Sequence, residues 1–272
     1  MLRYLLFVLC VASLPLGPLV RSAGPSPIIA PGAQLEVLGE GYSFTEGPSA
    51  DAAGNVYFTD QPNDRIVKWS VDGQTTDWLK PAGRSNGTYF DARGHLLACA
   101  DEKNELWSIS PEKKITVLLK NHDGKLFNGP NDLWIRPDGN LYFTDPLYKR
   151  PYWKRDPARQ QPGEFVYFMN LSSREAIPVA TDLKQPNGII GTPDGKTLYI
   201  ADIGAGKTYR YAVTPEGPLT GQQLFCELGS DGMTLDSEGN VYLTGKGVTV
   251  YSPAGQKITN IPVPEPRTAN VT

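Results

Sequence analysis

The sequence predicts an all-β fold, a β-propeller, and three observations carry this prediction. Glycine (28) and proline (24) are abundant among the 272 residues, which favours short strands and tight turns over long helices. A turn followed by a strand-like stretch recurs along the chain at long, similar intervals. The hydrophobic share of 40% and the aromatic share of 10% are large enough for a buried core, so the composition is not that of a disordered chain.

The repeat consists of a glycine turn and the alternating stretch that follows it. Its turn glycines are spaced by 40, 45, 56 and 44 residues. Glycine supplies the positive φ of a tight hairpin, and the stretch after it has the pattern of a half-buried strand. Four strands in each interval of this length are typical of a propeller blade, whereas a β-sandwich with accidental similarity between hairpins is the alternative. The five copies are DAAGNVYFTD (51–60), DARGHLLACA (91–100), RPDGNLYFTD (136–145), TPDGKTLYIAD (192–202) and DSEGNVYLTG (236–245).

The longest interval contains an insertion at residues 145–164, rich in proline, aromatic and basic residues. Such a segment is often only a surface excursion. On a propeller, however, it would leave the end of an inner strand, where loops surround the mouth of the channel. We therefore expect Tyr148 and Trp153 to contact a substrate there.

The N-terminus has the pattern of a secretory signal. Arg3 precedes an apolar run that small residues follow, so we assign residues 1–23 to a signal peptide, and a membrane anchor is the alternative. The expected location is periplasmic or secreted, with residues 33–272 forming one propeller domain. Cys10 would leave with the signal, whereas Cys99 and Cys226 lie in apolar strand-like stretches typical of buried thiols. A disulfide between these two remains open.

The composition also excludes several kinds of chemistry. A net charge of −3 argues against nucleic acid as a partner. The chain has only two histidines, His95 and His122, and lacks the GxSxG and HExxH motifs, which argues against a serine hydrolase or a histidine-ligated zinc site. Catalysis would then depend on carboxylates, amides and a hard metal ion.

An acid or a primary amide occurs eight residues before each repeat glycine. Equal offsets in equal blades imply equal positions, so we expect these side chains to begin the innermost strands and to point at the central axis. Such an all-oxygen set suits Ca²⁺ best, with Mg²⁺, Mn²⁺ and Zn²⁺ as alternatives. The competing interpretation is ordinary turn chemistry of Asx residues, which explains Glu46 poorly. The five residues are Glu46, Asn86, Asn131, Asn187 and Asp231.

Four of these positions carry a family resemblance. The context of Glu46 is followed, in this order, by the motifs NGPND (128–132), PNG (186–188) and SDGM (230–233). On these motifs the chain resembles the gluconolactonase family, which includes senescence marker protein and luciferin-regenerating-enzyme-like members. The resemblance implies one divalent metal at the mouth of the channel. The metal ligands it implies are Glu46, Asn131, Asn187 and Asp231. Asn86 matches a residue that contacts the substrate or supports the metal ligands, and we also expect Asn128 to contact the substrate.

The resemblance also implies six blades, although only five repeats are visible. We therefore expect a sixth blade that is truncated at PEPRTANVT (264–272), with Asn270 as the sixth member of the polar ring. A strand near residues 34–38 is expected to pair with the last blade.

The implied reaction is the opening of a sugar lactone to its aldonic acid by metal-activated water, with Asp231 as the general base. The alternatives are a phosphotriesterase-like or other ester hydrolase on the same site, and a binding module without catalysis. We expect a small-molecule lactone as the partner, and no association with a membrane once the signal is removed. The chain is expected to be a monomer or a weak oligomer. Gly129 stands where some members of the family have a substrate-binding arginine, a departure that affects the substrate contacts and not the metal ligands.

Overall fold

The computed structural model describes residues 28–272, and the predicted signal peptide and Cys10 lie outside the described residues. The chain divides into two units, of which the second is Val37–Thr272. The described part of the first unit, residues 28–36, contains a turn in which the Ala33 amide donates to the Ala30 carbonyl at 3.0 Å. Within residues 28–272, no helix has the length and apolar character needed to cross a membrane.

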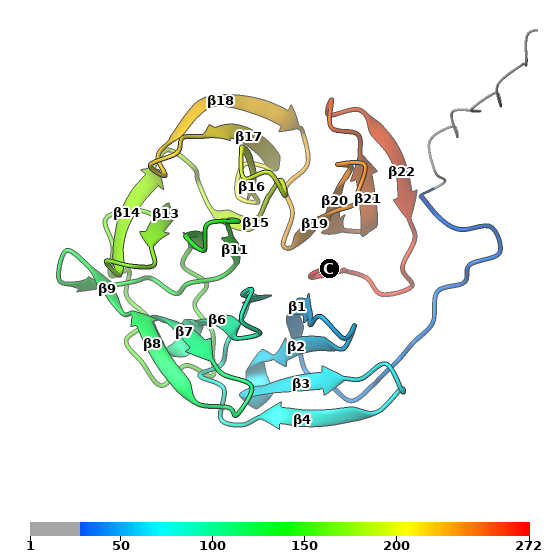
Figure 1. Ribbon diagram of the computed structural model, residues 1–272, viewed down its shortest axis with the longest axis horizontal. Helices are drawn as coiled ribbons and strands as arrows, with labels where there is room; N and C mark the ends of the chain where they lie inside the picture. Colours follow the sequence, from blue (N-terminus) through cyan, green and yellow to red (C-terminus); the bar gives the residue numbers. More distant parts are fainter. Residues whose placement is uncertain (1–27) are drawn as a thin grey trace, which may run out of the picture. The chain divides into compact units, whose positions relative to one another are not determined.

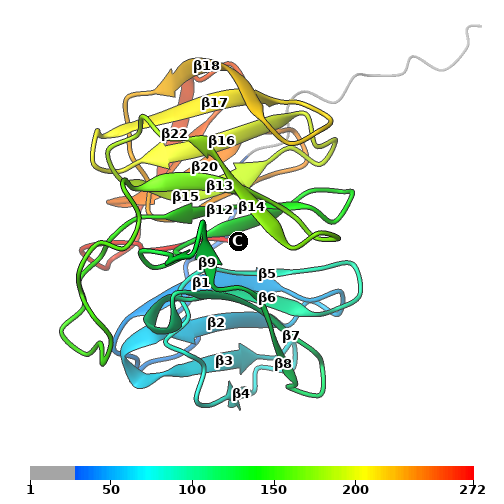
Figure 2. The same cartoon turned by 90° about the vertical axis from the view of Figure 1, so that its left-hand side faces the viewer.

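The second unit is a β-propeller. Five sheets of four antiparallel strands surround a central axis, and within each sheet the strands follow one another in sequence order from the axis outward (Figure 1). Seen from the side, the sheets stack around that axis (Figure 2). The first blade contains β1 (Thr45–Ala50), β2 (Val56–Asp60), β3 (Arg65–Trp69) and β4 (Thr75–Leu79). The second contains β5 (Thr88–Phe90), β6 (Leu96–Ala100), β7 (Glu105–Ile109) and β8 (Ile115–Leu119).

The other three blades repeat this order. The third contains β11 (Leu133–Ile135), β12 (Leu141–Asp145), β13 (Phe165–Asn170) and β14 (Glu175–Ala180). The fourth contains β15 (Pro186–Gly191), β16 (Thr197–Asp202), β17 (Lys207–Val213) and β18 (Leu219–Cys226). The fifth contains β19 (Met233–Leu235), β20 (Val241–Gly245), β21 (Gly247–Tyr251) and β22 (Lys257–Ile261). The remaining elements are the hairpin of β9 (Asn121–His122) and β10 (Lys125–Leu126) and the 3-10 turns η1 (Gln61–Asn63) and η2 (Asp101–Lys103).

The propeller prediction is confirmed, but the blade count of six is wrong for the described chain, which forms five blades. Residues 262–272 contain no strand, because they are too few for the hairpins of a blade, and they run from β22 back toward the axis (Figure 1). Residues 34–38 also form no strand, so the expected pairing with the last blade is not present.

The core lies between neighbouring blades, which explains why the second strand of each repeat is so apolar. β12 is buried along its whole length, and Tyr142 and Phe143 on its two faces are fully buried. Three apolar clusters follow the ring, between the first and second blades, the second and third, and the third to fifth. Cys99 and Cys226 are buried free thiols in these clusters, as expected, and no disulfide joins them.

Threonine hydroxyls tie the innermost strands of adjacent blades together. Thr59, in β2, donates to the Asn86 carbonyl at 3.0 Å, and Thr144, in β12, donates to the Asn187 carbonyl at 2.8 Å. Thr244, in β20, makes the same contact to the Ala269 carbonyl at 2.9 Å. The backbone of two predicted ring positions, Asn86 and Asn187, is therefore held from the preceding blade, and Asn270 follows a residue held in the same way.

Candidate functional site

The five predicted ring residues occupy equivalent places in the five blades. Glu46 and Asn187 lie in the innermost strands β1 and β15, and the other three each come two residues before an innermost strand. All five are buried, with exposed fractions between 1% and 9%. The five residues are Glu46, Asn86, Asn131, Asn187 and Asp231.

Direct contacts join several of these side chains. The Asn187 Nδ2 donates to Asp231 Oδ1 at 2.7 Å, so the fourth and fifth blades meet at this point. Asn270 donates from Nδ2 to Glu46 Oε2 at 3.1 Å, which places the expected sixth ring residue beside the first. The structure therefore brings together both carboxylates and two amides from parts of the chain that are distant in sequence.

Several oxygens of the ring are free to accept a ligand. Asn187 Oδ1 is buried and has no hydrogen-bond partner, which is costly unless a ligand occupies it. The Asn86 and Asn131 side chains make no hydrogen bonds within residues 28–272. Burial, and next the charge of Asp231, raise the pKa of Glu46 well above its usual range, because a buried carboxylate beside a second one is costly to ionise.

The ring fits a hard divalent cation through amide oxygens as well as carboxylates. Across the described part of the chain, no group of three or more His, Cys, Asp or Glu side chains is arranged to hold a metal ion. The ring differs from such a group because it contains two carboxylates, Glu46 and Asp231, and amides supply the other oxygens. The assignment of Glu46, Asn131, Asn187 and Asp231 as metal ligands stays a prediction.

An arginine that the sequence reasoning missed lies at this site. Arg267 Nη2 donates to Asp231 Oδ2 at 2.6 Å, and the arginine side chain is 58% exposed. Arg267 and Asn270 both come from the segment after β22, so this segment contacts both carboxylates of the ring. The sequence carried no periodic signal for Arg267, because it lies outside the repeats.

The insertion at residues 145–164 does approach the ring. The Asn187 Nδ2 also donates to the Tyr148 hydroxyl at 2.8 Å, which places this predicted substrate contact beside the candidate ligands. Tyr152 donates from its hydroxyl to Gln61 Oε1 at 2.8 Å, and this bond anchors the loop on the first blade. Trp153 is half-buried beneath the guanidinium of Arg155, at 3.5 Å from the ring centroid, so its contact with substrate stays a prediction.

The geometry disagrees with the prediction that Asn128 contacts substrate. This side chain is fully buried and holds the insertion from within. Its Nδ2 donates to the carbonyls of Asp145 and Gly163, and its Oδ1 accepts from the amides of Gln160 and Gln161, at 2.8–3.1 Å. All the hydrogen-bonding capacity of the amide is therefore used by the protein.

The glycines after the ring residues have a role that the sequence reasoning missed. A Cβ at Gly87 would lie 2.6 Å from the Asn131 carbonyl oxygen, and one at Gly188 would lie 2.8 Å from that of Asp231. The absence of a side chain therefore lets neighbouring innermost strands approach closely around the axis. Glycine follows four of the five ring residues, and this recurrence in the sequence could have indicated the close approach of the strands.

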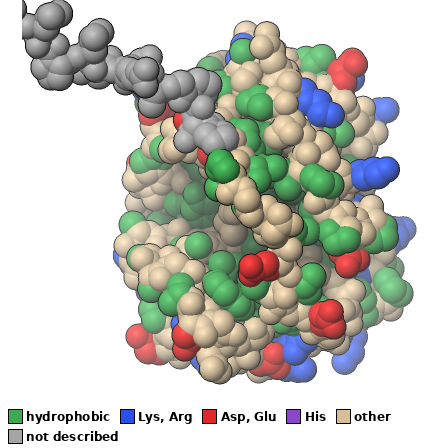
Figure 3. All heavy atoms as spheres, turned by 90° about the vertical axis from the view of Figure 1, so that its right-hand side faces the viewer, with side chains coloured by type: hydrophobic (Ala, Val, Ile, Leu, Met, Phe, Trp, Pro, Cys, Tyr) green, Lys and Arg blue, Asp and Glu red, His purple; other side chains and the backbone are tan. Residues whose placement is uncertain are grey.

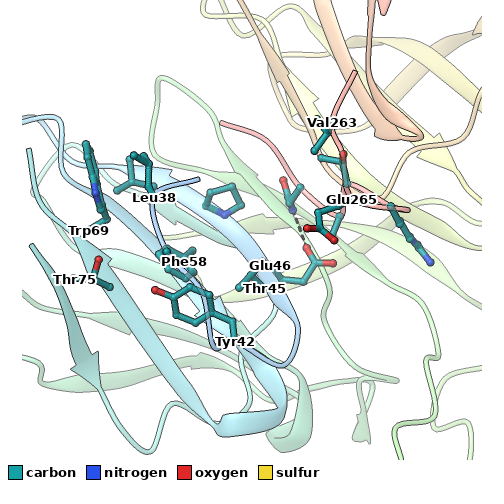
Figure 4. A pocket seen from close by; sticks show the side chains of 16 residues that line it. Leu38, Tyr42, Thr45, Glu46, Phe58, Trp69, Thr75, Val263 and Glu265 are labelled. Carbon is teal, nitrogen blue, oxygen red and sulfur yellow. Dashed lines mark hydrogen bonds between the residues drawn. The ribbon is translucent and has the colours of Figure 1, made fainter. Parts of the chain in front are cut away.

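A cavity of about 440 Å³ extends from the ring along the face of the first blade. Aromatic and aliphatic side chains, including Tyr42, Phe58 and Trp69, form one wall (Figure 4). On the opposite side Glu46 lies near Glu265, which belongs to the segment after β22. Hydrophobic side chains gather around a recess on this side of the domain (Figure 3). The cavity includes Glu46, Arg267 and Asn270, so it is continuous with the candidate site.

A second set of aspartates holds the approach to the ring. The set has three members, and each is the last residue of the second strand of its blade. Each carboxylate accepts hydrogen bonds from two successive backbone amides that come before the innermost strand of the same blade. Asp145 accepts from Asn128 at 2.9 Å and from Gly129 at 2.8 Å. The three are Asp60, Asp145 and Asp202.

Asp145 leads to a prediction for the pH dependence of stability. Burial raises its pKa from 3.8 to about 7, so between these values the folded chain holds a proton that the unfolded chain has released. The contribution of Asp145 to the free energy of unfolding is fully present below pH ~4. It is lost as the pH rises through ~7, at about 1.4 kcal/mol per pH unit. We expect Asp145→Asn to remove a slope of about this size from the free energy of unfolding between pH ~4.5 and ~6.5. Urea unfolding in the presence of a chelator measures the slope, and an unchanged slope would contradict the prediction.

The chain resembles known proteins over most of its length. Residues 44–272 match the family described as the SMP-30/Gluconolactonase/LRE-like region. A gluconolactonase of Zymomonas mobilis is 25% identical over 251 residues, which are 82% of this chain and 70% of that protein.

Solved structures agree with this assignment. The structure of a gluconolactonase from Xanthomonas campestris is 27% identical with a TM-score of 0.81, and the match covers 86% of this chain and 81% of that one. A structure reported as a candidate gluconolactonase is 29% identical with a TM-score of 0.83, covering 89% and 85%. With its propeller and its polar ring, the chain belongs to the SMP-30/gluconolactonase/LRE-like family.

Proposed function

We propose that the chain is a metal-dependent lactonase that opens a sugar lactone to its aldonic acid. The observation that carries this proposal is the convergence of Glu46 and Asp231 with amide oxygens, among which the buried Asn187 Oδ1 has no partner in the protein. The similarity to gluconolactonases from Zymomonas and Xanthomonas supports a lactone as the substrate.

The residues of the ring have separate roles in this proposal. Glu46, Asn131, Asn187 and Asp231 would hold one divalent cation, for which Ca²⁺ suits the oxygen donors best. When bound, this cation would act as a Lewis acid and would lower the pKa of water. Asp231 accepts a proton from the attacking water, and the Asn187 amide orients the Asp231 carboxylate through the 2.7 Å hydrogen bond. Tyr148 and Asn86 face the substrate.

We also propose that the protein is exported to the periplasm or secreted, from the charged, apolar and small-residue pattern of residues 1–23. Detection of a mature chain that begins near residue 24 in the exported fraction would support this proposal, and retention of the uncleaved chain in the cell would contradict it.

The function is tested by following acid release from glucono-1,5-lactone with a pH indicator, before and after chelation. Chelator-treated protein is expected to lose the enzymatic rate and to recover it when Ca²⁺, Mg²⁺, Mn²⁺ or Zn²⁺ is returned. A rate above the spontaneous opening that is unaffected by chelation would contradict metal dependence, and no rate with any of the four ions would contradict the proposed activity. A phosphotriester substrate in the same assay tests the alternative hydrolase.

Arg267 gives a prediction for metal affinity. Its guanidinium occupies Asp231 Oδ2, so it competes with a cation for this carboxylate. We expect Arg267→Gln to tighten divalent cation binding by about 2- to 5-fold, because an exposed ion pair contributes up to about 1 kcal/mol. Calorimetric titration of Ca²⁺ into chelator-treated protein measures this change, with Arg93→Gln on a distant turn as the control. Unchanged or weaker affinity would contradict the prediction.

A further inference from the structure

Arg150, in the insertion at residues 145–164, stands at the mouth of the candidate site. Its guanidinium carbon lies 4.9 Å from the centroid of the Tyr148 ring and 5.7 Å from that of the Phe44 ring. Tyr148 contacts Asn187 through its hydroxyl, and Phe44 comes two residues before Glu46. The two aromatic rings therefore hold the Arg150 guanidinium beside the polar ring.

The hydrogen-bonding capacity of this guanidinium is unused. The Arg150 side chain is only 21% exposed, and it donates no hydrogen bond to any residue in the range 28–272. Its Nε is buried and without a partner. An arginine carries five N–H donors in a planar fork, and leaving such donors buried without acceptors is unfavourable. The guanidinium is therefore prepared for acceptors that the protein does not supply.

Asp101 does not supply them. Its Oδ2 is 4.0 Å from Arg150 Nε, beyond hydrogen-bond distance. The same carboxylate already accepts from Gln61 at 2.9 Å and pairs with Arg155 at 3.3 Å. Gln61 and Arg155 thus satisfy Asp101 at shorter range, and Arg150 meets this carboxylate only in a longer ion pair that uses none of its N–H donors.

The charged side chains at the mouth bear on the sign of a ligand that Arg150 would bind. A divalent cation would neutralise Glu46 and Asp231, and it would release Arg267 from Asp231. Arg150 and Arg267 would then remain beside the ring as cationic donors, together with the carboxylates of Asp101 and Glu265. Burial raises the pKa of Tyr148 to about 12, and the charges of Asp231, Arg150 and Arg267 act on its hydroxyl as smaller influences, so all three lie near it.

We propose that Arg150 binds an anionic substituent, so that the preferred substrate is a sugar lactone carrying a carboxylate or a phosphate. This inference rests on the lactonase function proposed above and specifies its substrate class. A guanidinium fork matches two oxygens of either anion, and its stacking on Tyr148 and Phe44 holds the fork in place.

The test compares three lactones with the metal-loaded protein. Glucono-1,5-lactone is neutral, glucaro-1,4-lactone carries a carboxylate, and 6-phosphoglucono-1,5-lactone carries a phosphate. We expect kcat/KM to be at least about 10-fold higher for one of the anionic lactones, and the higher of the two identifies the anion. Equal or lower kcat/KM for both anionic lactones would overturn the inference.

The Arg150→Met variant assigns the effect to this residue. The expected result is an increase in KM of about 10- to 100-fold for the anionic lactone, with less than about 3-fold change for the neutral one. Arg150→Lys should restore part of the loss, because the charge is kept without the fork. Arg93→Met, on an exposed turn where the arginine pairs with Asp91, is the matched control. An equal loss for all three lactones would indicate a structural role for Arg150 and would overturn the inference.

Binding measurements separate this inference from the proposed function. Calorimetry with glucarate, 6-phosphogluconate and gluconate requires no turnover. Tighter binding of one of the first two, lost in Arg150→Met at an unchanged melting temperature, supports the anion site even if no lactone is opened. Equal affinity for all three ligands, or an anion preference that survives Arg150→Met, overturns it even if glucono-1,5-lactone is hydrolysed.

Discussion

Asp231→Asn is expected to reduce metal-dependent lactone opening by about 10²- to 10⁴-fold, which is the usual contribution of a positioned general base. The substitution preserves the size of the side chain but removes the charge that accepts a proton from water. It also removes one of the two carboxylates that converge at the ring, so weaker divalent cation binding is expected in the same variant. Initial rates at saturating metal separate the loss of proton transfer from the loss of affinity.

Asp77→Asn is the matched control for this variant. Asp77 lies in β4 and forms an exposed ion pair with Arg65, away from the ring. Its rate should remain within about 2-fold of the unmodified protein, because exposed pairs contribute little. If Asp231→Asn retains more than about a tenth of the rate while it binds metal normally, Asp231 is not the general base.

Gly87→Ala is expected to destabilise the propeller by about 1–3 kcal/mol or more, the usual range for overpacking. The new Cβ would lie 2.5 Å from Asp132 Oδ1 and 2.6 Å from the Asn131 carbonyl oxygen. The carbonyl belongs to the backbone, which is held by the hydrogen bond from the Gly87 amide at 2.6 Å and cannot move aside. The second and third blades must therefore separate at the axis.

Gly245→Ala is the control for this effect. Gly245 ends β20, and a Cβ there would have no heavy atom within 4 Å. Neither glycine has a positive φ, so a difference between the two variants reports the space available to the new Cβ. Backbone strain does not contribute to it. Urea unfolding of both variants measures the difference. Equal free energies of unfolding would show that the close approach of the blades at Gly87 is not needed for stability.

The repeated blade could be predicted because its information is local. Each turn glycine and the alternating stretch after it lie within about ten residues, and the same hairpin reappears in the structure as β1–β2, β5–β6, β11–β12, β15–β16 and β19–β20. The register of the ring was predictable for the same reason, since a constant offset of eight residues from the turn needs no knowledge of distant contacts. The blade count was not, because the expected sixth blade came from the family resemblance and not from a sixth repeat.

The sequence by itself determined the propeller, the five polar positions at its axis and the insertion that approaches them. Only the tertiary structure decided which of these side chains meet. It placed Arg267 on Asp231 and Asn270 on Glu46, buried Asn128 inside the insertion, and left the Arg150 guanidinium between two aromatic rings without an acceptor. The physical reason is that a repeat specifies the conformation of its own hairpin, whereas these contacts join segments up to 224 residues apart and depend on the closure of the ring.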